Sequence, residues 1–266
     1  MKLPSYVAGI GVWSVLLPSW AACRGRLLGE PQPQTENKLP PADWLPAVER
    51  RRATLSTRVV LCVTKDALTD AGWEPAELPT VFASSSGSPD ITNELCSALA
   101  AGETQISPTR FHNSVHNAAA GYYSIAVACR ASSTTLCAHD GSAAAGLLEA
   151  SVLLATEATR ALFVAFDVPY TGPLAEIRPI ANPFGVALAL APEPAPGQLA
   201  QLLVERSPRQ DHALSTCHDS GLEYIRVNNP SARLLPLLEA FARREPAQVV
   251  LGMASGGQLL VEVTPC

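Results

Sequence analysis

The side chains best suited to covalent chemistry lie in one stretch, residues 111–150, which reads FHNSVHNAAAGYYSIAVACRASSTTLCAHDGSAAAGLLEA. Cys137 offers a thiol, and a thiolate is a strong nucleophile for acyl transfer. Asp140 offers a carboxylate three residues later, and His112 and His116 offer imidazoles. These residue types could support covalent chemistry at a thiol, provided that the fold brings them together.

Other kinds of site fit the sequence less well. His112 and His116 are four residues apart, but HNSVH lacks the Glu of a zinc-binding HExxH helix, so we expect no metal. Ser142 lies in DGSAAAG and not in the GxSxG pattern of a serine hydrolase. The serine-rich loop 84–88 has no Lys after its Gly, so it is not a phosphate-binding loop. We therefore expect no cofactor, and hydrogen bonding near a helix start is the simpler role for the two histidines.

The elements that must position these residues alternate between strands and helices. We predict a buried strand at 133–138, a sharp turn at Asp140 and a helix at 141–156. The other predicted strands are 6–10, 80–83, 161–166, 185–190, an edge strand at 199–204, and a closing pair at 249–253 and 258–263. The other predicted helices are 20–28, 56–71 (with Ser56 as its N-cap), 91–101, 115–128 and 231–243. This alternation predicts an α/β fold with a largely buried sheet.

Composition limits the classes of partner. The 266 residues are 47% hydrophobic and 16% charged, with a net charge of −5. The longest basic run is Arg50–Arg52, so nucleic acid is an unsuitable partner. These arginines suit either a solvated helix start, which we favour, or contact with an acidic carrier protein. No apolar run reaches the ~20 residues that a membrane span needs.

The cysteines and the first residues bear on the compartment. Seven cysteines show no CxxC spacing and have apolar neighbours, so we expect reduced thiols and a cytoplasmic protein. The start MKLPSYVAGIGVWSVLLPSWAAC also looks like a secretory signal, with small residues before Cys23. Pro4 and Pro18 interrupt that run, and Gly9–Val12 reads better as a strand entering a loop, so we favour the strand.

Several blocks resemble the thiolase-fold β-ketoacyl synthases. YVAGIGV at 6–12 is similar to the opening strand of that family, and VFASSSG at 81–87 to its second strand and following loop. ISPTRFHNSVHNAAAG at 106–121 resembles the helix that leads into the active-site strand. The blocks AVERRRA, FHNSVHNAAAGY and GSAAAGLLEAS most resemble the truncated ketosynthase-like proteins of aryl polyene clusters, called chain-length factors. The resemblance is clear over residues 5–167 and weak beyond Asp167.

The resemblance implies a site without the family's nucleophile. Counting forward from Arg130, and back from the strand at 161–165, places the family's nucleophilic cysteine at Asp140. The family's His-Gly-Thr-Gly-Thr block is absent, and His212 and His218 match neither histidine motif. The tail GMASGGQLLVEV still resembles the closing Gly-Gly loop. The resemblance therefore implies a ketosynthase N-terminal-like region at 1–190, and a shortened C-terminal region at 191–266 that completes the same domain.

Structural roles compete with chemical ones at both positions. Asp140 would also suit a helix N-cap, which is worth ~1 kcal/mol. Cys137 precedes Asp140 by three residues, an offset that turns it to the opposite face of a strand, so we expect a buried core thiol.

Two functional hypotheses follow from the resemblance. The first is a non-catalytic subunit that pairs with a full-length ketosynthase as a heterodimer and shapes its acyl tunnel, with Phe111, His116 and Tyr122 as tunnel or interface candidates. An acyl carrier protein would then dock on the partner, because this acidic chain suits an acidic carrier poorly. The second is a stand-alone thiol acyltransferase or condensing enzyme that uses Cys137.

Overall fold

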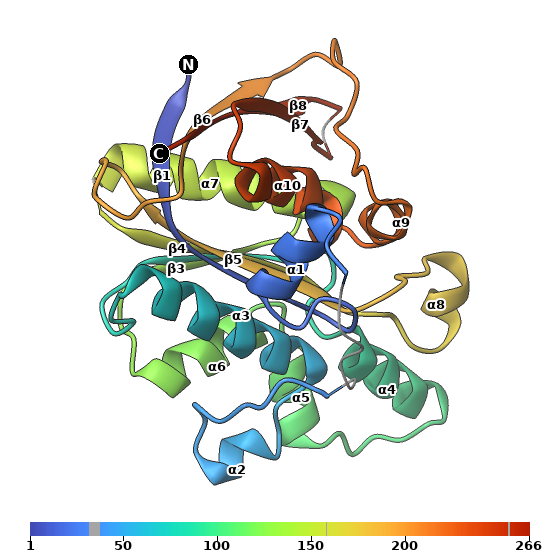
Figure 1. The fold of residues 1–266 in the computed structure, drawn as a ribbon. Helices are drawn as coiled ribbons and strands as arrows, with labels where there is room; N and C mark the ends of the chain where they lie inside the picture. The colour runs from blue at the N-terminus through green and yellow to red at the C-terminus, as the bar shows by residue number, and fades with distance from the viewer. Residues whose placement is uncertain (32–37, 158, 255) are drawn as a thin grey trace.

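In the computed structural model, which describes residues 1–31, 38–157, 159–254 and 256–266, eight strands form one mixed sheet (Figure 1). The strand order is β3-β2-β4-β5-β1-β6-β8-β7. Only β2 pairs in parallel, with β3 and β4, and the other pairs in the described sheet are antiparallel. The strands are β1 (Leu3–Ser14), β2 (Thr80–Ala83), β3 (Ser133–Leu136), β4 (Ala161–Asp167), β5 (Phe184–Ala191), β6 (Ala200–Ser207), β7 (Ala247–Gly252) and β8 (Gln258–Pro265).

Helices cover both faces of the sheet. The α-helices are α1 (Trp20–Leu27), α2 (Ala47–Arg50), α3 (Leu55–Ala71), α4 (Pro89–Ala100), α5 (Pro108–Ser114), α6 (Ala118–Val127), α7 (Ser142–Glu157), α8 (Pro173–Ile177), α9 (Ser220–Asn228) and α10 (Leu235–Arg243). Two 3-10 turns, η1 (His139–Gly141) and η2 (Ser231–Leu234), precede α7 and α10. One core cluster joins the sheet to α1, α7 and α10, and a second joins it to α3 and α6 (Figure 1). Of the described helices, none combines the length and hydropathy required to traverse a bilayer.

Helix α3 packs directly against the backbone of β1. A Cβ atom at Gly11 would overlap the carbonyl group of Val63, and one at Gly9 would overlap the carbonyl oxygen of Ala67. Only glycine permits this close approach. Thr54 caps the start of α3 by accepting a hydrogen bond from the backbone N–H of Thr57 at 3.2 Å, so the predicted cap at Ser56 is wrong. Gly72 ends the helix in the left-handed conformation, with φ of 65°.

Most predicted elements are present, and the α/β class is confirmed. Helix α1, strands β2 and β4, helix α7 and the closing β7–β8 pair lie within about two residues of the predicted ranges. Strands β4 and β5 are buried along their whole length. For strands β4 and β5, the continuous apolar run is the sequence signal that a fully buried strand gives.

Two predictions about position in the sheet are wrong. The strand expected at the edge, 199–204, is β6, and it pairs with β1 on one side and with β8 on the other. The strand expected to be buried, 133–138, is β3, which forms an edge of the described sheet, ends at Leu136 and exposes Ser133 and Thr134. Neither STTLCA nor LAQLLV alternates strictly between apolar and polar residues, and a short run of this kind does not identify the neighbours of a strand in the sheet.

The predicted helix at 115–128 is also wrong at its start. Pro108 begins a separate helix, α5, and Val115 then takes an extended conformation with ψ of 141°, so α6 begins only at Ala118. The predicted helix at 231–243 divides into η2 and α10. Helices α2, α8 and α9 were not predicted. Helices α2 and α8 have only four and five residues, which is too short for a helical period to appear in the sequence.

Gly11→Ala should destabilise the fold, because the new methyl group would meet the Val63 carbonyl. We expect the free energy of unfolding to fall by about 2–3 kcal/mol in urea titrations. Gly121→Ala is the matched control, since the space around Gly121 in α6 is open. That change should stabilise the helix by up to about 1 kcal/mol. Equal effects of the two substitutions would contradict the packing described for β1 and α3.

Candidate functional site

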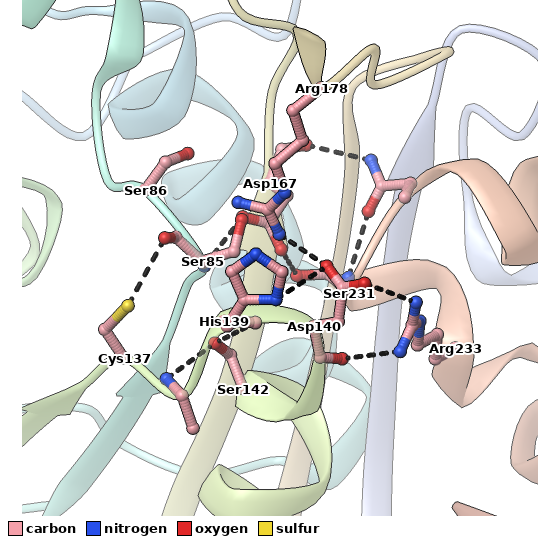
Figure 2. A network of polar contacts seen from close by, with 12 residues as sticks. Ser85, Ser86, Cys137, His139, Asp140, Ser142, Asp167, Arg178, Ser231 and Arg233 are labelled. Carbon is pink, nitrogen blue, oxygen red and sulfur yellow. Dashed lines mark hydrogen bonds and ion pairs between the residues drawn. The ribbon is translucent and has the colours of Figure 1, made fainter. Parts of the chain in front are cut away.

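A sharp turn between β3 and α7 carries Asp140 (Figure 2). His139 has a positive φ of 50°, which reverses the chain direction just before Asp140. The Ser142 hydroxyl holds the turn by accepting from the Ala138 N–H at 2.9 Å and donating to the His139 carbonyl at 2.6 Å. A Cβ atom at Gly141 would overlap the backbone of Ala254, so the closing β7–β8 loop packs directly on this turn. The turn at Asp140 is therefore where the sequence predicted it.

Two arginines hold the Asp140 carboxylate (Figure 2). Arg178 Nη2 donates to Oδ1 at 2.5 Å, and Arg233 Nη2 donates to Oδ2 at 2.8 Å. Arg233 Nη1 also donates to the Asp140 backbone carbonyl at 3.1 Å. Burial alone would raise the pKa of Asp140, but the hydrogen bond from Arg178 and the charges of Arg233 and Arg178 outweigh it, and the pKa is lowered. Asp140 is therefore ionised at neutral pH.

The alternative role of Asp140, as a helix N-cap, is not the one that the structure shows. The turn η1 has no side-chain cap, and the recorded hydrogen bonds of the carboxylate come from guanidinium groups. A charged guanidinium is a stronger donor to a carboxylate than a neutral backbone N–H. The two arginines are 38 and 93 residues away in the chain, so the sequence near Asp140 holds no sign of them.

A second carboxylate, Asp167, lies fully buried behind the turn at the end of β4 (Figure 2). Ser85 donates to Oδ1 from its N–H at 2.8 Å and its hydroxyl at 2.6 Å, and Ser84 donates at 3.2 Å. Ser231 donates to Oδ2 at 2.6 Å. Burial raises the pKa of Asp167, and the donors act in the opposite direction. This carboxylate joins the loop after β2, the end of β4 and the start of η2.

Cys137 is not the buried thiol that we expected. It is exposed, and its Sγ donates to the Ser85 carbonyl at 3.3 Å (Figure 2). The reason is the edge position of β3, which leaves the region after the strand uncovered in the single chain. Cys137 and Asp140 therefore flank the same turn, but only Asp140 faces the arginines.

The three tunnel or interface candidates lie in different environments. Phe111 projects from α5 with 64% of its surface exposed. His116 is half-buried in the link between α5 and α6, with Nε2 3.0 Å from the Ser84 carbonyl oxygen. Tyr122 is buried in α6 and meets the edge of the His112 ring at a centroid distance of 6.0 Å. The link also separates His112 from His116, so the two histidines share no helix face. Within the described ranges, no group of three or more His, Cys, Asp or Glu side chains could hold a metal.

A pocket of about 310 Å³ opens beside Asp140. Its walls include Arg233 and Gly141, together with Gln210, His212 and Gln258 from the C-terminal region. Gln258 fixes the neighbouring loop by donating to the His212 carbonyl at 2.6 Å and accepting from the His212 N–H at 3.2 Å. Because His212 matches no histidine motif, its position near Asp140 could not be predicted from the sequence. His218 lies elsewhere, with Nδ1 2.6 Å from the Glu239 carboxylate.

Comparisons with known proteins identify the family and the fold of the chain. The sequence profile described as "Beta-ketoacyl synthase, N-terminal domain" matches residues 20–235. No curated protein matches the sequence. A solved structure of the ketosynthase ApeO in complex with its chain length factor ApeC, from Xenorhabdus doucetiae, matches with a TM-score of 0.69 and 22% identity, over 98% of this chain and 100% of that chain.

Two further solved structures have the same fold. The ishigamide ketosynthase/chain length factor matches with a TM-score of 0.74 and 13% identity, over 98% of this chain and 99% of that chain. The complex AntDE:AntF, a type II polyketide synthase carrier protein with its ketosynthase, matches with a TM-score of 0.73 and 12% identity, over 100% of both chains. Identities this low establish a shared fold and nothing finer.

The ion pairs of Asp140 predict a pH-dependent contribution to stability. Because the pKa is lowered in the folded chain, the ionised carboxylate stabilises the fold above the unfolded pKa, and this contribution is lost as the pH falls through the folded pKa. Asp140→Asn should lower the free energy of unfolding by about 1–2 kcal/mol at pH 7. The difference in the free energy of unfolding between Asp140→Asn and the wild type should become smaller below about pH 4.

The matched control is Asp43→Asn, whose carboxylate meets a single exposed lysine, Lys65, at 2.8 Å. Such a pair contributes less than about 1 kcal/mol. Denaturation curves from pH 3 to pH 8 for both variants would measure the difference. A loss for Asp140→Asn that is no larger than that for Asp43→Asn would show that the two arginines do not stabilise the turn.

Proposed function

The chain belongs to the β-ketoacyl synthase family, and we propose that it serves there as a non-catalytic subunit that pairs with an active ketosynthase and shapes its acyl tunnel. The observation that carries the proposal is the arginine-bound carboxylate of Asp140 on the turn between β3 and α7. Condensation through an acyl-enzyme needs a thiolate there. A carboxylate neutralised by two guanidinium groups is a poor nucleophile and cannot form a thioester.

The surface around β3 supports pairing. Strand β3 is an edge of the described sheet and carries Ser133, Thr134 and Thr135, with no charged residue or proline to block another strand. Phe111, Val115 and Ile125 are all at least 45% exposed on or between α5 and α6, next to the segment that leads into β3. An unprotected strand edge can pair with another chain, which supports an interface at β3. An obligate interface should bury more than ~2,000 Å².

The structures with the same fold include two whose names join a ketosynthase with a chain length factor. That naming, together with the blocks quoted above for aryl polyene clusters, supports an assignment to type II fatty acid or polyketide biosynthesis. We assign residues 1–190 to the ketosynthase N-terminal-like region and 191–266 to a shortened C-terminal region. The second region supplies β6, β8 and β7 to the same sheet, which supports one shared domain.

We propose that the acyl carrier protein docks on the partner subunit and not on this chain. Arg50 is engaged within its own chain, where Nη2 donates to the Asp43 and Leu45 carbonyls at 3.3 and 3.0 Å. Arg52 forms an ion pair with Glu49 at 3.6 Å. The net charge of −5 also disfavours an acidic carrier. The seven cysteines are all within the described residues and are free thiols, which supports a reducing compartment such as the cytoplasm.

A second function has one observation in its favour. The exposed thiol of Cys137 is accessible to an acyl donor, so a thiol acyltransferase acting through Cys137 is the competing proposal. Cys137→Ser separates the two. The substitution abolishes acyl transfer if Cys137 is the nucleophile, and leaves product formation by the paired enzyme within about twofold if it is not.

Co-expression with the full-length ketosynthase of its own gene neighbourhood should give a stable complex with one copy of each chain. The purified chain alone should show no decarboxylative condensation. Gel filtration with light scattering measures the stoichiometry, and a carrier-bound product assay measures condensation. A stable monomer that ignores the co-expressed ketosynthase, or condensation by the chain alone, would overturn the proposal.

Phe111→Ala should alter products of the complex and not the fold of this chain. The side chain is exposed here, so its removal should change stability by less than about 0.5 kcal/mol. At the wall of a partner's tunnel, the same removal opens space for a longer acyl chain. Tyr224→Ala is the matched control, because Tyr224 is 61% exposed on α9, far from α5 (Figure 1). Unchanged product lengths and an intact complex in both variants would remove Phe111 from the tunnel and the interface.

A further inference from the structure

The charges around Asp140 do not balance. Two guanidinium groups, Arg178 and Arg233, converge on one carboxylate, although the chain as a whole carries a net charge of −5. Arginine pairs arranged in this way are typical of sites that bind a free carboxylate, because the planar guanidinium groups offer several N–H donors in a fixed geometry. Each Asp140 oxygen accepts from a different arginine, as a bound carboxylate ligand would.

We propose that Arg178 and Arg233 form a carboxylate-binding site that the chain fills with Asp140 as an internal ligand, and that the vacated site takes a small carboxylate from solution. The site is then blocked as well as lacking a thiol. The proposal does not depend on pairing with another subunit, since the arginines and Asp140 belong to the same chain.

The arginines are held in place without the Asp140 side chain. Arg178 Nη1 donates to the Tyr170 hydroxyl at 2.7 Å, and its guanidinium lies 5.6 Å from the centre of the Tyr170 ring. Arg233 Nη1 donates to the backbone carbonyl of residue 140, which any substitution there retains. Arg233 also belongs to η2, whose first residue, Ser231, is bonded to the buried Asp167 carboxylate at 2.6 Å (Figure 2). The site is therefore preorganised for a ligand.

A ligand has a route to the site. The pocket of about 310 Å³ beside the turn is lined by both Asp140 and Arg233, and the Asp140 side chain is 39% exposed. The pocket is also lined by the polar side chains of Gln210, His212 and Gln258. Apart from Asp140, none of the described lining residues is an acid that would repel an anion. Asp140→Ala removes one carboxylate group and leaves space of that size, so formate is the matching probe.

The test is thermal unfolding of the full chain, alone or in the complex if the two chains co-purify, in sodium formate and in sodium chloride at equal ionic strength. For Asp140→Ala, 100 mM formate should raise the Tm by about 2–5 °C beyond chloride. The wild type should show a difference below about 1 °C, because its site is filled. The double variant Asp140→Ala/Arg233→Ala should lose at least half of the formate effect.

Two controls keep the result interpretable. Asp43→Ala vacates a carboxylate beside one exposed lysine and should show no formate-specific shift. Asp140→Ser, a second vacating substitution, provides folded protein if the alanine variant is insoluble, and the same shift is expected. Equal responses to formate and chloride in the vacated variants would overturn the proposal. So would a formate effect of the same size in the wild type.

Discussion

The contact of the Asp140 carboxylate with Arg178 and Arg233 fixes the character of the candidate site. It joins three parts of the chain that are distant in sequence, namely the turn after β3, the end of α8 and the turn η2. Both arginines are oriented by other contacts. Arg178 is held by Tyr170, and Arg233 lies in the turn η2. The two guanidinium groups are matched by the carboxylate at position 140, and a carboxylate cannot carry an acyl group as a thioester.

Behind this contact, the buried Asp167 provides the support. Serine donors from the loop after β2 and from η2 meet its two oxygens, and Asn229 adds a hydrogen bond to its backbone carbonyl at 3.2 Å. The parallel strands β2 and β4 bring these groups to one end of the sheet. Arg233 is therefore positioned through Asp167. These bonds hold the turn η2, and with it Arg233, close to position 140, which supports the proposal of a subunit that acts by shape.

The sequence was sufficient for the strands, for helices α1, α3 and α7 and for the turn at Asp140, and it was not sufficient for the shorter and divided helices. Counting residues forward from Arg130, and back from the strand at 161–165, led to Asp140 without any three-dimensional information. The sequence was not sufficient for the partners of Asp140, since Arg178 and Arg233 lie in short, irregular segments far along the chain. It also misplaced β6 and β3 in the sheet, and with β3 the exposure of Cys137. These errors share one cause, which is that the local sequence of a strand does not identify its neighbours in the sheet.

In the proposed function, this chain carries no acyl group while its partner catalyses condensation. Intact-protein mass spectrometry of the purified complex, after incubation with an acyl carrier protein thioester, tests it directly because the two subunits differ in mass. We expect an acyl adduct on the full-length ketosynthase and an unmodified mass for this chain. A stoichiometric acyl adduct on this chain, at Cys137 or at any other residue, would contradict it.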